Sequence, residues 1–315
     1  MVIPTPVMVE LSSRGQRVRG PAFGTVRRGA WVPTGTDLLD PDVRIAAVAA
    51  QLPPHAVVGG WSAARLHELA TGAPDPVFDG GRRWQEARAD GPVARVVVCA
   101  ARHSRLAHRP DVRVFRSPVP EESRARVLGV VASTPARTAL DMARLLPVTS
   151  GVIAVDRMLA LGLLTVDELA ALVLAPGQWQ GRAAARRVLD LCAPGTESPQ
   201  ESVLRLLWLD AGLPRPMVNA RVLDPAGRFV ARVDLLDPDA GVVGEYDGGV
   251  HSGSARRSTG AARQESLEEL GLLVVRATSV DVGDSGARAW QARLRAAYGR
   301  ASRRPAAARR WVVVP

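Results

Sequence analysis

Three carboxylates and an imidazole lie close together in the sequence near residue 240. Asp234 lies near the end of one apolar run, and Glu245, Asp247 and His251 end or follow the next run. Because successive strand residues point to opposite faces, Glu245 and Asp247 share a face if the second run is a strand. A hairpin that sets Asp234 beside them gathers acidic oxygens that repel one another unless a divalent cation binds. The segment therefore predicts a metal-dependent hydrolase site, with Mg²⁺ or Mn²⁺ held by Asp234, Glu245 and Asp247.

Such a site suits the hydrolysis of phosphodiester bonds. That reaction needs an activated water and neutralisation of the charge that develops on phosphorus, and carboxylate-bound Mg²⁺ supplies both. His251 follows Asp247 by four residues. We expect it to orient or deprotonate the water, or to donate to a phosphate oxygen.

Each candidate acid also has an ordinary structural interpretation, which the sequence leaves open. Asp234 suits a turn before two leucines, and Glu245 can pair with Arg232 across the hairpin. Asp247 precedes Gly248, and an Asp-Gly pair begins many turns.

Two residues outside the hairpin are equally ambiguous. Glu201 is a further candidate acid, but its spacing from Ser198 is that of a capping box, which by itself explains an acid there. Arg263 can contact phosphate, or it can pair with Glu245 or Glu265. The other histidines lack partners at zinc spacing and are predicted to be structural: His55, His67, His103 and His108.

The elements that must position these residues begin after a helix-breaking segment at 193–197. Their predicted order is α-β-β-β-α-β with one more helix, which suggests a mixed sheet with a helix against each face. The expected helices are 198–210, 260–270 and 285–298, and the expected strands are 217–223, 229–236, 241–246 and 272–278.

Residues 1–196 predict a mixed α/β region with a helical second half. Ser133 is the expected N-cap of one helix, and Thr165 with Glu168 forms a capping box at another. The expected strands are 26–33, 57–58, 93–100, 112–116 and 127–132, and the expected helices are 42–51, one from 62, 133–145, 151–161, one from 165 and 181–192.

Composition indicates a globular chain that is long enough for two domains, since 47% of its 315 residues are apolar. All 41 basic residues are arginine, and the net charge is +10. A basic surplus favours a polyanionic partner, although the codon bias of a GC-rich genome also explains arginine without lysine. The segment 288–310 has eight arginines and no acid, as expected of a nucleic-acid contact or of a solvated helix face with a frayed end.

Cysteine usage and hydropathy point to a cytoplasmic protein. Cys99 and Cys192 are expected to be buried, reduced thiols. No apolar run reaches the roughly 18–20 residues that a membrane-spanning helix needs, and we expect no signal peptide.

The C-terminal pattern resembles the restriction-endonuclease-like, or PD-(D/E)XK, superfamily, and within it the branch of very-short-patch-repair (Vsr-like) endonucleases. This resemblance implies a Mg²⁺-dependent endonuclease acting on DNA, with Asp234 and Glu245 as metal ligands and Glu201 as a further acid. Asp247 stands where the wider superfamily has lysine, as is typical of this branch. The resemblance rests on residues 198–205, 211–214, 233–234, 245–248, His251, Arg263 and 271–276.

One departure from that branch concerns the helix after the hairpin. The branch commonly has an acid three residues before Arg263, where this chain has Gly260. The arginines expected to contact nucleic acid are Arg256, Arg257, Arg263 and Arg276.

The N-terminal part resembles AbiEi-type antitoxins or winged-helix regulators at residues 27–33, 62–67 and 134–141. The resemblance implies DNA binding or regulation. Residues 1–25 hold no convincing helix pair, so only a strand-like wing at 26–33 is expected from a degenerate winged-helix-like start.

The leading hypothesis is a Mg²⁺-dependent DNA endonuclease, in repair, phage defence or a toxin–antitoxin context. Its regions would be an antitoxin-like part at 1–196, an endonuclease-like domain at 197–300 and an Arg-rich tail at 301–315. The alternative is a non-catalytic, nucleic-acid-binding antitoxin-like regulator, and a third possibility is an RNase toxin. Expected partners are DNA, with RNA left open, and a second copy or a toxin–antitoxin protein; no membrane partner is expected.

Overall fold

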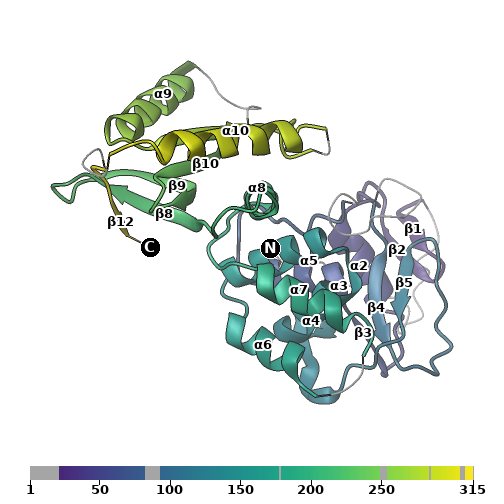
Figure 1. The fold of residues 1–315 in the computed structure, drawn as a ribbon. Coiled ribbons are helices and arrows are strands. Elements are labelled where there is room, and N and C mark those ends of the chain that lie inside the picture. The colour runs from purple at the N-terminus through teal and green to yellow at the C-terminus, as the bar shows by residue number, and fades with distance from the viewer. Residues whose placement is uncertain are drawn as a thin grey trace. The chain divides into compact units, whose positions relative to one another are not determined.

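The computed structural model describes residues 21–81, 93–176, 179–248, 254–283, 285–305 and 309–314, and for 254–261 the backbone alone. The chain forms two compact units, residues 1–190 and 191–315 (Figure 1). Both combine helices with strands, which confirms the α+β fold class. Across the described ranges, no helix is long and apolar enough to span a membrane. The three predicted regions with their boundaries stay a prediction.

An antiparallel hairpin begins the described chain, where the sequence predicted one strand over 26–33. The chain reverses at Gly29, whose φ of 85° lies in the left-handed region that glycine adopts without steric cost. The elements are β1 (Phe23–Arg27), β2 (Ala30–Pro33) and helix α2 (Pro41–Ala49). The hairpin packs on α2 through a small buried cluster, formed by Ala30, Val32, Val43 and Ala47. We call β1, β2 and their turn the wing.

A five-stranded sheet forms the centre of the N-terminal unit, in the order β5-β4-β3-β7-β6. The pairs β4–β5 and β3–β7 are parallel, and the pairs β3–β4 and β6–β7 are antiparallel. Because β4 and β5 are parallel, their carboxyl ends lie at the same edge of the sheet. The strands are β3 (Ala56–Val58), β4 (Val96–Ala100), β5 (Val112–Phe115), β6 (Arg124–Val127) and β7 (Val130–Ser133).

Strands β6 and β7 form a hairpin where the sequence predicted one strand over 127–132. Leu128 and Gly129 both have positive φ, 48° and 85°, as the tight turn of a hairpin requires at its two central residues. Leucine rarely adopts this conformation, which is why the apolar run conceals the turn.

Helices complete the N-terminal unit, and α4 contacts α3, α5 and α6. The predicted N-cap of α4 is wrong, because Thr134 takes that position and Ser133 Oγ instead hydrogen-bonds to Thr138 Oγ1 at 2.7 Å. The capping box of Thr165 with Glu168 at the start of α6 is confirmed. The helices are α3 (Gly60–Ala70), the 3₁₀ helix η1 (Glu121–Ser123), α4 (Pro135–Leu145), α5 (Val148–Ala160), α6 (Val166–Leu174) and α7 (Arg182–Leu191).

The C-terminal unit has the predicted element order α-β-β-β-α-β, followed by a further helix. Its sheet is mixed, in the order β11-β10-β9-β8-β12 with β10 and β11 parallel. The largest departure is at α9, which begins at Ser254 rather than at 260. The elements are α8 (Pro199–Asp210), β8 (Met217–Leu223), β9 (Phe229–Asp237), β10 (Val242–Tyr246), α9 (Ser254–Glu269), β11 (Leu273–Ala277) and α10 (Ala287–Ala301).

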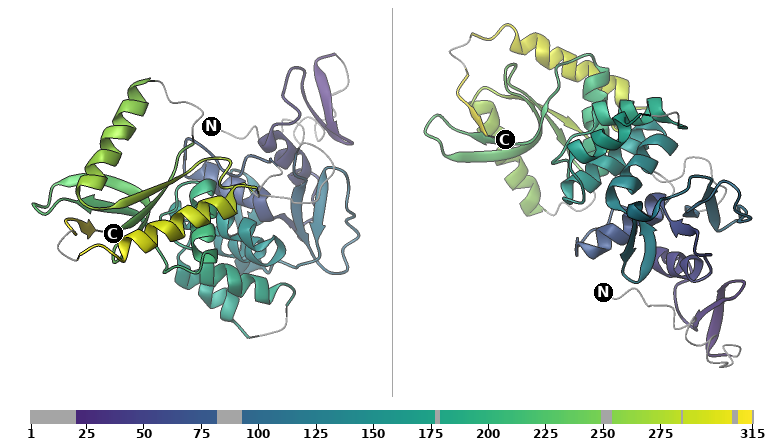
Figure 2. Two further views of the ribbon diagram at one scale, coloured as in Figure 1. Left: turned by 45° about the horizontal axis from the view of Figure 1, so that its top comes forward. Right: turned by 90° about the horizontal axis from the view of Figure 1, so that it is seen from below.

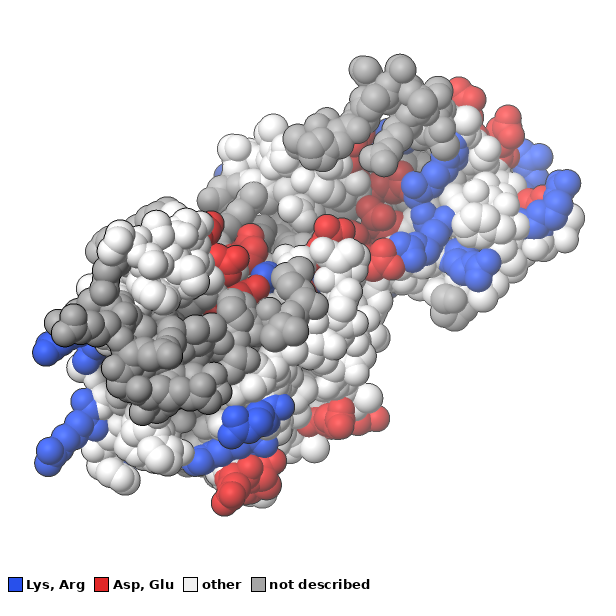
Figure 3. Space-filling model, turned by 180° about the vertical axis from the view of Figure 1, so that it is seen from behind, with Lys and Arg blue, Asp and Glu red and all other residues white. Residues whose placement is uncertain are grey.

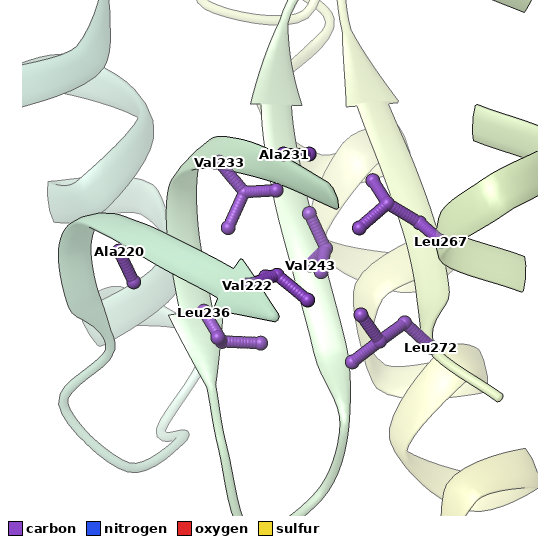
Figure 4. Packing of buried hydrophobic residues seen from close by; sticks show 8 residues of the cluster. All are labelled: Ala220, Val222, Ala231, Val233, Leu236, Val243, Leu267 and Leu272. Carbon is purple, nitrogen blue, oxygen red and sulfur yellow. The ribbon is translucent and has the colours of Figure 1, made fainter. Parts of the chain in front are cut away.

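Helices cover both faces of this sheet, as predicted, and the two views of Figure 2 show α9 and α10 on opposite sides of it. On one face, Leu267 of α9 packs into a cluster of strand residues (Figure 4). On the other, Trp208 of α8 lies beside Trp290 of α10, with 6.5 Å between ring centroids. Gly244 leaves room for this layer, because a Cβ atom there would lie 3.1 Å from the Trp208 ring.

The sequence analysis missed the last strand, β12 (Val312–Val314), which lies in the predicted Arg-rich tail and pairs antiparallel with β8. Trp311 anchors it, since its ring fills the space over Gly241 and its Nε1 donates to the carbonyl of Pro238 at 3.3 Å. Three consecutive β-branched residues were the available signal, although the run is short.

Candidate acidic site of the C-terminal unit

Strands β9 and β10 bring Asp234 and Glu245 together. In their antiparallel register Gly244 faces Leu235, so the next pair along is Glu245 and Asp234. The Tyr246 N–H donates to Asp234 Oδ2 at 2.8 Å, which holds the carboxylate against β10. The hairpin therefore places Asp234 beside Glu245, as the sequence predicted.

Asp234 lies where the side-chain alternation of β9 changes phase. Val233 and Leu236 are three residues apart, yet both belong to the core cluster that includes Leu267, which strict alternation would not allow. On β8, Asn219 lies opposite Asp234 and has a positive φ of 50°. Local irregularities of this kind re-aim side chains and occur often beside functional sites.

Burial raises the pKa of the Asp234 carboxyl to about 6. The Glu201 and Glu245 carboxylates push this pKa further up, while the Tyr246 N–H and the Arg263 guanidinium oppose the rise. Two other candidate acids thus act on Asp234 through space, and the three form one electrostatic group. A carboxyl with this pKa exchanges protons near neutral pH, as general acids and bases do.

Glu245 is a buried carboxylate that faces Arg263 of α9. Arg263 Nη2 donates to Glu245 Oε1 at 2.5 Å and also to the carbonyl oxygen of Arg232. Burial raises the pKa of Glu245, against the lowering effects of Arg263 and Arg276. The predicted pairing of Glu245 with Arg232 is wrong, because Arg232 pairs with Glu197 at 2.5 Å. Of the two interpretations of Arg263, the pairing with Glu245 is the one observed.

Ser198 caps α8 as predicted, but the predicted capping box is incomplete, because the Glu201 carboxylate does not accept from the Ser198 N–H. The Glu201 backbone N–H donates to Ser198 Oγ at 3.2 Å, and its carboxylate accepts from Ser198 Oγ and from the Glu197 N–H. Asn219 also donates to this carboxylate, at 3.1 Å. Sequence reasoning missed Asn219. The available signal was an asparagine inside a strand pattern, because asparagine tolerates positive φ better than most residues.

Asp247 lies just beyond the end of β10. Its N–H donates to the carbonyl of Ala277 at 2.7 Å, and its half-exposed carboxylate lies 3.7 Å from Arg276 Nη1. It raises the pKa of Glu245 through space, which links it to the other acids. The predicted acids thus influence one another through space, and Arg263 and Arg276 partly neutralise Glu245.

The carboxylate oxygens of these acids do not gather around a single point at which they would hold a metal. Among the residues whose placement is described, no group of three or more His, Cys, Asp or Glu side chains has that arrangement. Glu245 faces Arg263, and the Glu201 carboxylate accepts hydrogen bonds from Glu197, Ser198 and Asn219, so their oxygens are engaged elsewhere. Metal binding by Asp234, Glu245 and Asp247 therefore stays a prediction. His251 and the side chains of Arg256 and Arg257 lie outside the described residues.

The Arg-rich tail contacts the C-terminal unit itself. Arg310 Nη2 donates to the carbonyl of Glu269 at 2.7 Å, and its N–H donates to that of Leu270. Arg304 Nη1 donates to the carbonyl of Gly271. These carbonyls lie at the carboxyl end of α9, where cations are stabilised. On the face shown in Figure 3, acidic and basic side chains lie next to one another on this unit rather than in a single basic area.

The comparisons with known proteins concern mainly the other unit. Residues 55–191, less than half of the chain, match the family model of the AbiEi antitoxin C-terminal domain. Two uncharacterized proteins of Mycobacterium tuberculosis, MT2308 (strain CDC 1551 / Oshkosh) and Rv2248 (strain ATCC 25618 / H37Rv), are each 32% identical over 151 residues. The match covers 48% of this chain and 55% of each relative, so the chain spans about half the length of the curated relatives it matches. No solved structure shows a significant match.

The family match supports the predicted likeness of the N-terminal part to AbiEi-type antitoxins. Its range begins one residue before β3 and ends with α7, so it contains the five-stranded sheet and the helices from α3 to α7. The wing and α2 precede it. The likeness of residues 197–300 to restriction-endonuclease-like proteins stays a prediction.

Proposed function

We propose that the chain is an antitoxin-like regulator that binds nucleic acid. The match of residues 55–191 to the AbiEi antitoxin C-terminal domain carries this proposal. The wing before the matched range supports a nucleic-acid contact, because a two-stranded ribbon fits the major groove of DNA. Arg28 is exposed at the turn of the wing, whereas Arg27 pairs with Asp111 at 3.2 Å.

The charge of the chain supports the same partner. Its net charge of +10 comes entirely from arginine, which forms paired hydrogen bonds with phosphate oxygens. Since Arg304 and Arg310 of the tail are engaged with α9, the wing is a better candidate for the contact than the tail.

A binding assay tests this proposal. Fluorescence anisotropy would compare the duplex upstream of the chain's own coding sequence with a shuffled duplex, over a series of salt concentrations. We expect preference for the upstream duplex, and Arg28→Ala should reduce the salt slope by about 1, as the loss of one phosphate contact does. Arg187→Ala removes another exposed arginine and should leave binding unchanged. Equal affinity for both duplexes would contradict the regulator.

The antitoxin part needs a separate test. Each reading frame that flanks the coding sequence would be expressed in bacteria with and without the chain. We expect one flanking product to slow growth only when the chain is absent. Growth that never depends on the chain would exclude an antitoxin action on a neighbouring gene product.

A second candidate function is metal-dependent phosphodiester hydrolysis by the C-terminal unit. The observation in its favour is the coupled set of acids around Asp234, whose pKa is raised to about 6, since strongly shifted pKa values cluster at functional sites. In such a reaction Asp234 and Glu245 would bind Mg²⁺ and Arg276 would approach a phosphate oxygen. The cation would supply an activated water and neutralise the developing charge.

Cleavage assays separate the two functions. Supercoiled DNA, linear DNA and RNA would be incubated with the full chain and Mg²⁺ or Mn²⁺. If the site is a nuclease, Asp234→Ala and Glu245→Ala abolish cleavage, and Asp239→Ala, an exposed acid in the same hairpin, retains it. No cleavage of any substrate, together with sequence-preferring binding, would leave the regulator as the function.

A further inference from the structure

The N-terminal unit contains a cavity of about 490 Å³ at the edge where β4 and β5 end. Small-molecule sites commonly have volumes of about 300–1,000 Å³, and in α/β sheets ligands bind beyond the carboxyl ends of parallel strands. The carboxyl end of α4 and the segment before α7 close the cavity. Its described polar and aromatic lining consists of Arg102, Phe115, Arg116, Ser117, Arg144, Trp179 and Gln180.

The lining has three arginines and no acid. Arg116 is held by two backbone carbonyls, those of Ser104 and Leu106. Arg144 is held by Asp141 and donates to the carbonyl of Gln180 at 3.3 Å. Such fixed guanidinium groups need no reordering when an anion arrives, which favours binding.

Arg102 differs from the other two arginines of the lining. It is exposed, and the described structure gives it no hydrogen bond and no ion pair. Its guanidinium is therefore available to form paired hydrogen bonds with an incoming phosphate.

The hydroxyl of Ser117 lies against a buried acid–arginine cluster. Arg137 Nη2 and Arg144 Nη2 donate to Ser117 Oγ at 2.7 and 2.5 Å. A serine hydroxyl has two acceptor lone pairs and one hydrogen to donate. With both lone pairs in use, the hydrogen is left to donate toward a ligand acceptor. Asp141 pairs with both Arg137 and Arg144. Its single negative charge offsets only one of these two positive charges, so the wall of the cavity stays positive.

The cavity also offers aromatic surface. Phe115 and Trp179 both line it, and the Arg113 guanidinium lies 4.9 Å from the Phe115 ring centroid. An aromatic side chain stacks on any nucleobase, because every base has a π-face. A site with fixed cations, a hydroxyl donor and a stacking surface matches a flat ring joined to a phosphate.

We propose that this cavity binds a nucleotide, with its phosphate at Arg102 and Ser117 and its base against Trp179. A free mononucleotide and the 5′-phosphorylated end of a nucleic acid share this chemistry. The site lies within residues 55–191, so it adds a ligand to the region matched by the antitoxin family.

Isothermal titration calorimetry of the full chain tests the proposal. The probes are AMP, GMP, CMP, UMP, adenosine, ribose 5-phosphate, inorganic phosphate and a 5′-phosphorylated trinucleotide. We expect at least one mononucleotide to bind ~10-fold or more tightly than adenosine, ribose 5-phosphate and phosphate, because ring and phosphate contacts both contribute. Competition between that mononucleotide and the trinucleotide, with and without its 5′-phosphate, distinguishes the free ligand from a nucleic-acid end.

Matched variants locate the binding. Arg102→Ala should weaken mononucleotide binding by ~10-fold, as the loss of a charge-assisted contact does. Arg105→Ala removes an exposed arginine of the same loop outside the cavity lining and should have no effect. Trp179→Phe should keep the preference for AMP over ribose 5-phosphate, and Trp179→Leu should remove it. Equal effects of the Arg102 and Arg105 variants, or no saturable binding by any probe, would overturn the proposal.

Discussion

Both units contain buried acids beside arginines, and the clusters around Asp141 and Asp234 have opposite charge balance. In the N-terminal unit, Asp141 is fully buried between Arg137 and Arg144, with nitrogen–oxygen distances of 2.9 and 2.7 Å. In the C-terminal unit, Asp234 is half-buried near other acids, and its pKa is raised to about 6. The same residue types thus form a positive wall in one unit and an acidic site in the other.

The difference shows that the stability of a buried carboxylate depends on how many hydrogen-bond donors surround it. Asp141 accepts hydrogen bonds from two guanidinium groups, which offset the desolvation of its charge. For Asp234 the described hydrogen bond is one backbone N–H, and its acidic neighbours disfavour ionisation. We therefore interpret the Asp141 cluster as structural, because it holds neighbouring side chains in place. We interpret the Asp234 cluster as a candidate functional site, because its carboxylates repel one another.

The largest expected effect comes from breaking the balanced cluster. Asp141→Ala leaves two largely buried guanidinium groups without their carboxylate and should lower the free energy of unfolding by ~3–5 kcal/mol. Urea unfolding of the full chain measures the change. Glu122→Ala, an exposed acid of the same unit, should change stability by no more than about 0.5 kcal/mol. Equal losses for both variants would show that the Asp141 pairs contribute nothing.

Removing Asp234, the acid at the centre of the other cluster, should raise the free energy of unfolding instead of lowering it. Because the folded-state pKa of Asp234 is raised from 3.8 to about 6, the native state holds its proton longer than the unfolded state. Its contribution to stability therefore falls as pH rises between about 4 and 6. Asp234→Asn should raise the free energy of unfolding at pH 8 by up to ~3 kcal/mol and flatten this pH dependence.

Thermal unfolding of wild type and Asp234→Asn at pH 4.5 and pH 8 makes the comparison. The variant should gain stability at pH 8 and change little at pH 4.5. A variant less stable than wild type at pH 8 would mean that the ionised carboxylate is well accommodated, contrary to the comparison of the two clusters.

A smaller effect is expected from removing the arginine that partly neutralises the acidic cluster. Arg263→Ala deprives Glu245 of its charge-assisted hydrogen bond and should cost about 1–2 kcal/mol at pH 8, since the arginine is partly exposed. The loss should shrink as the pH falls, because burial raises the pKa of Glu245 and the carboxylate is then increasingly protonated. Unfolding by urea at pH 4.5 and pH 8 measures both values, and a loss that does not depend on pH would point to packing instead.

The smallest effect is expected from a surface pair in the turn between β8 and β9. Arg228 pairs with Asp224 at 2.7 Å, but its side chain is 82% exposed. Arg228→Ala should change stability by less than about 1 kcal/mol. It serves as the control for Arg263→Ala, and a loss as large as that of the Arg263 variant would remove the distinction between surface and buried pairs.

Local patterns in the sequence predicted much of the C-terminal unit. The element order from α8 to β11 followed from apolar runs, turn residues and the spacing of Ser198 and Glu201. The Asp234–Glu245 hairpin followed from the same patterns. The hairpin at Leu128 and Gly129 was missed because leucine at positive φ carries no local turn signal. Strand β12 was missed because its pairing with β8 depends on residues far apart in the chain.

By itself, the sequence determined which segments form helices and strands and which carboxylates lie at the strand ends, because both follow from backbone periodicity over a few residues. Only the tertiary structure decided which charges meet. Arg263 faces Glu245 while Arg232 faces Glu197, and the cavity at the ends of β4 and β5 collects residues from positions as far apart as Arg102 and Gln180. These partners come together only when helices and strands pack against one another. The resulting ratio of acids to arginines is what makes the Asp141 and Asp234 clusters differ.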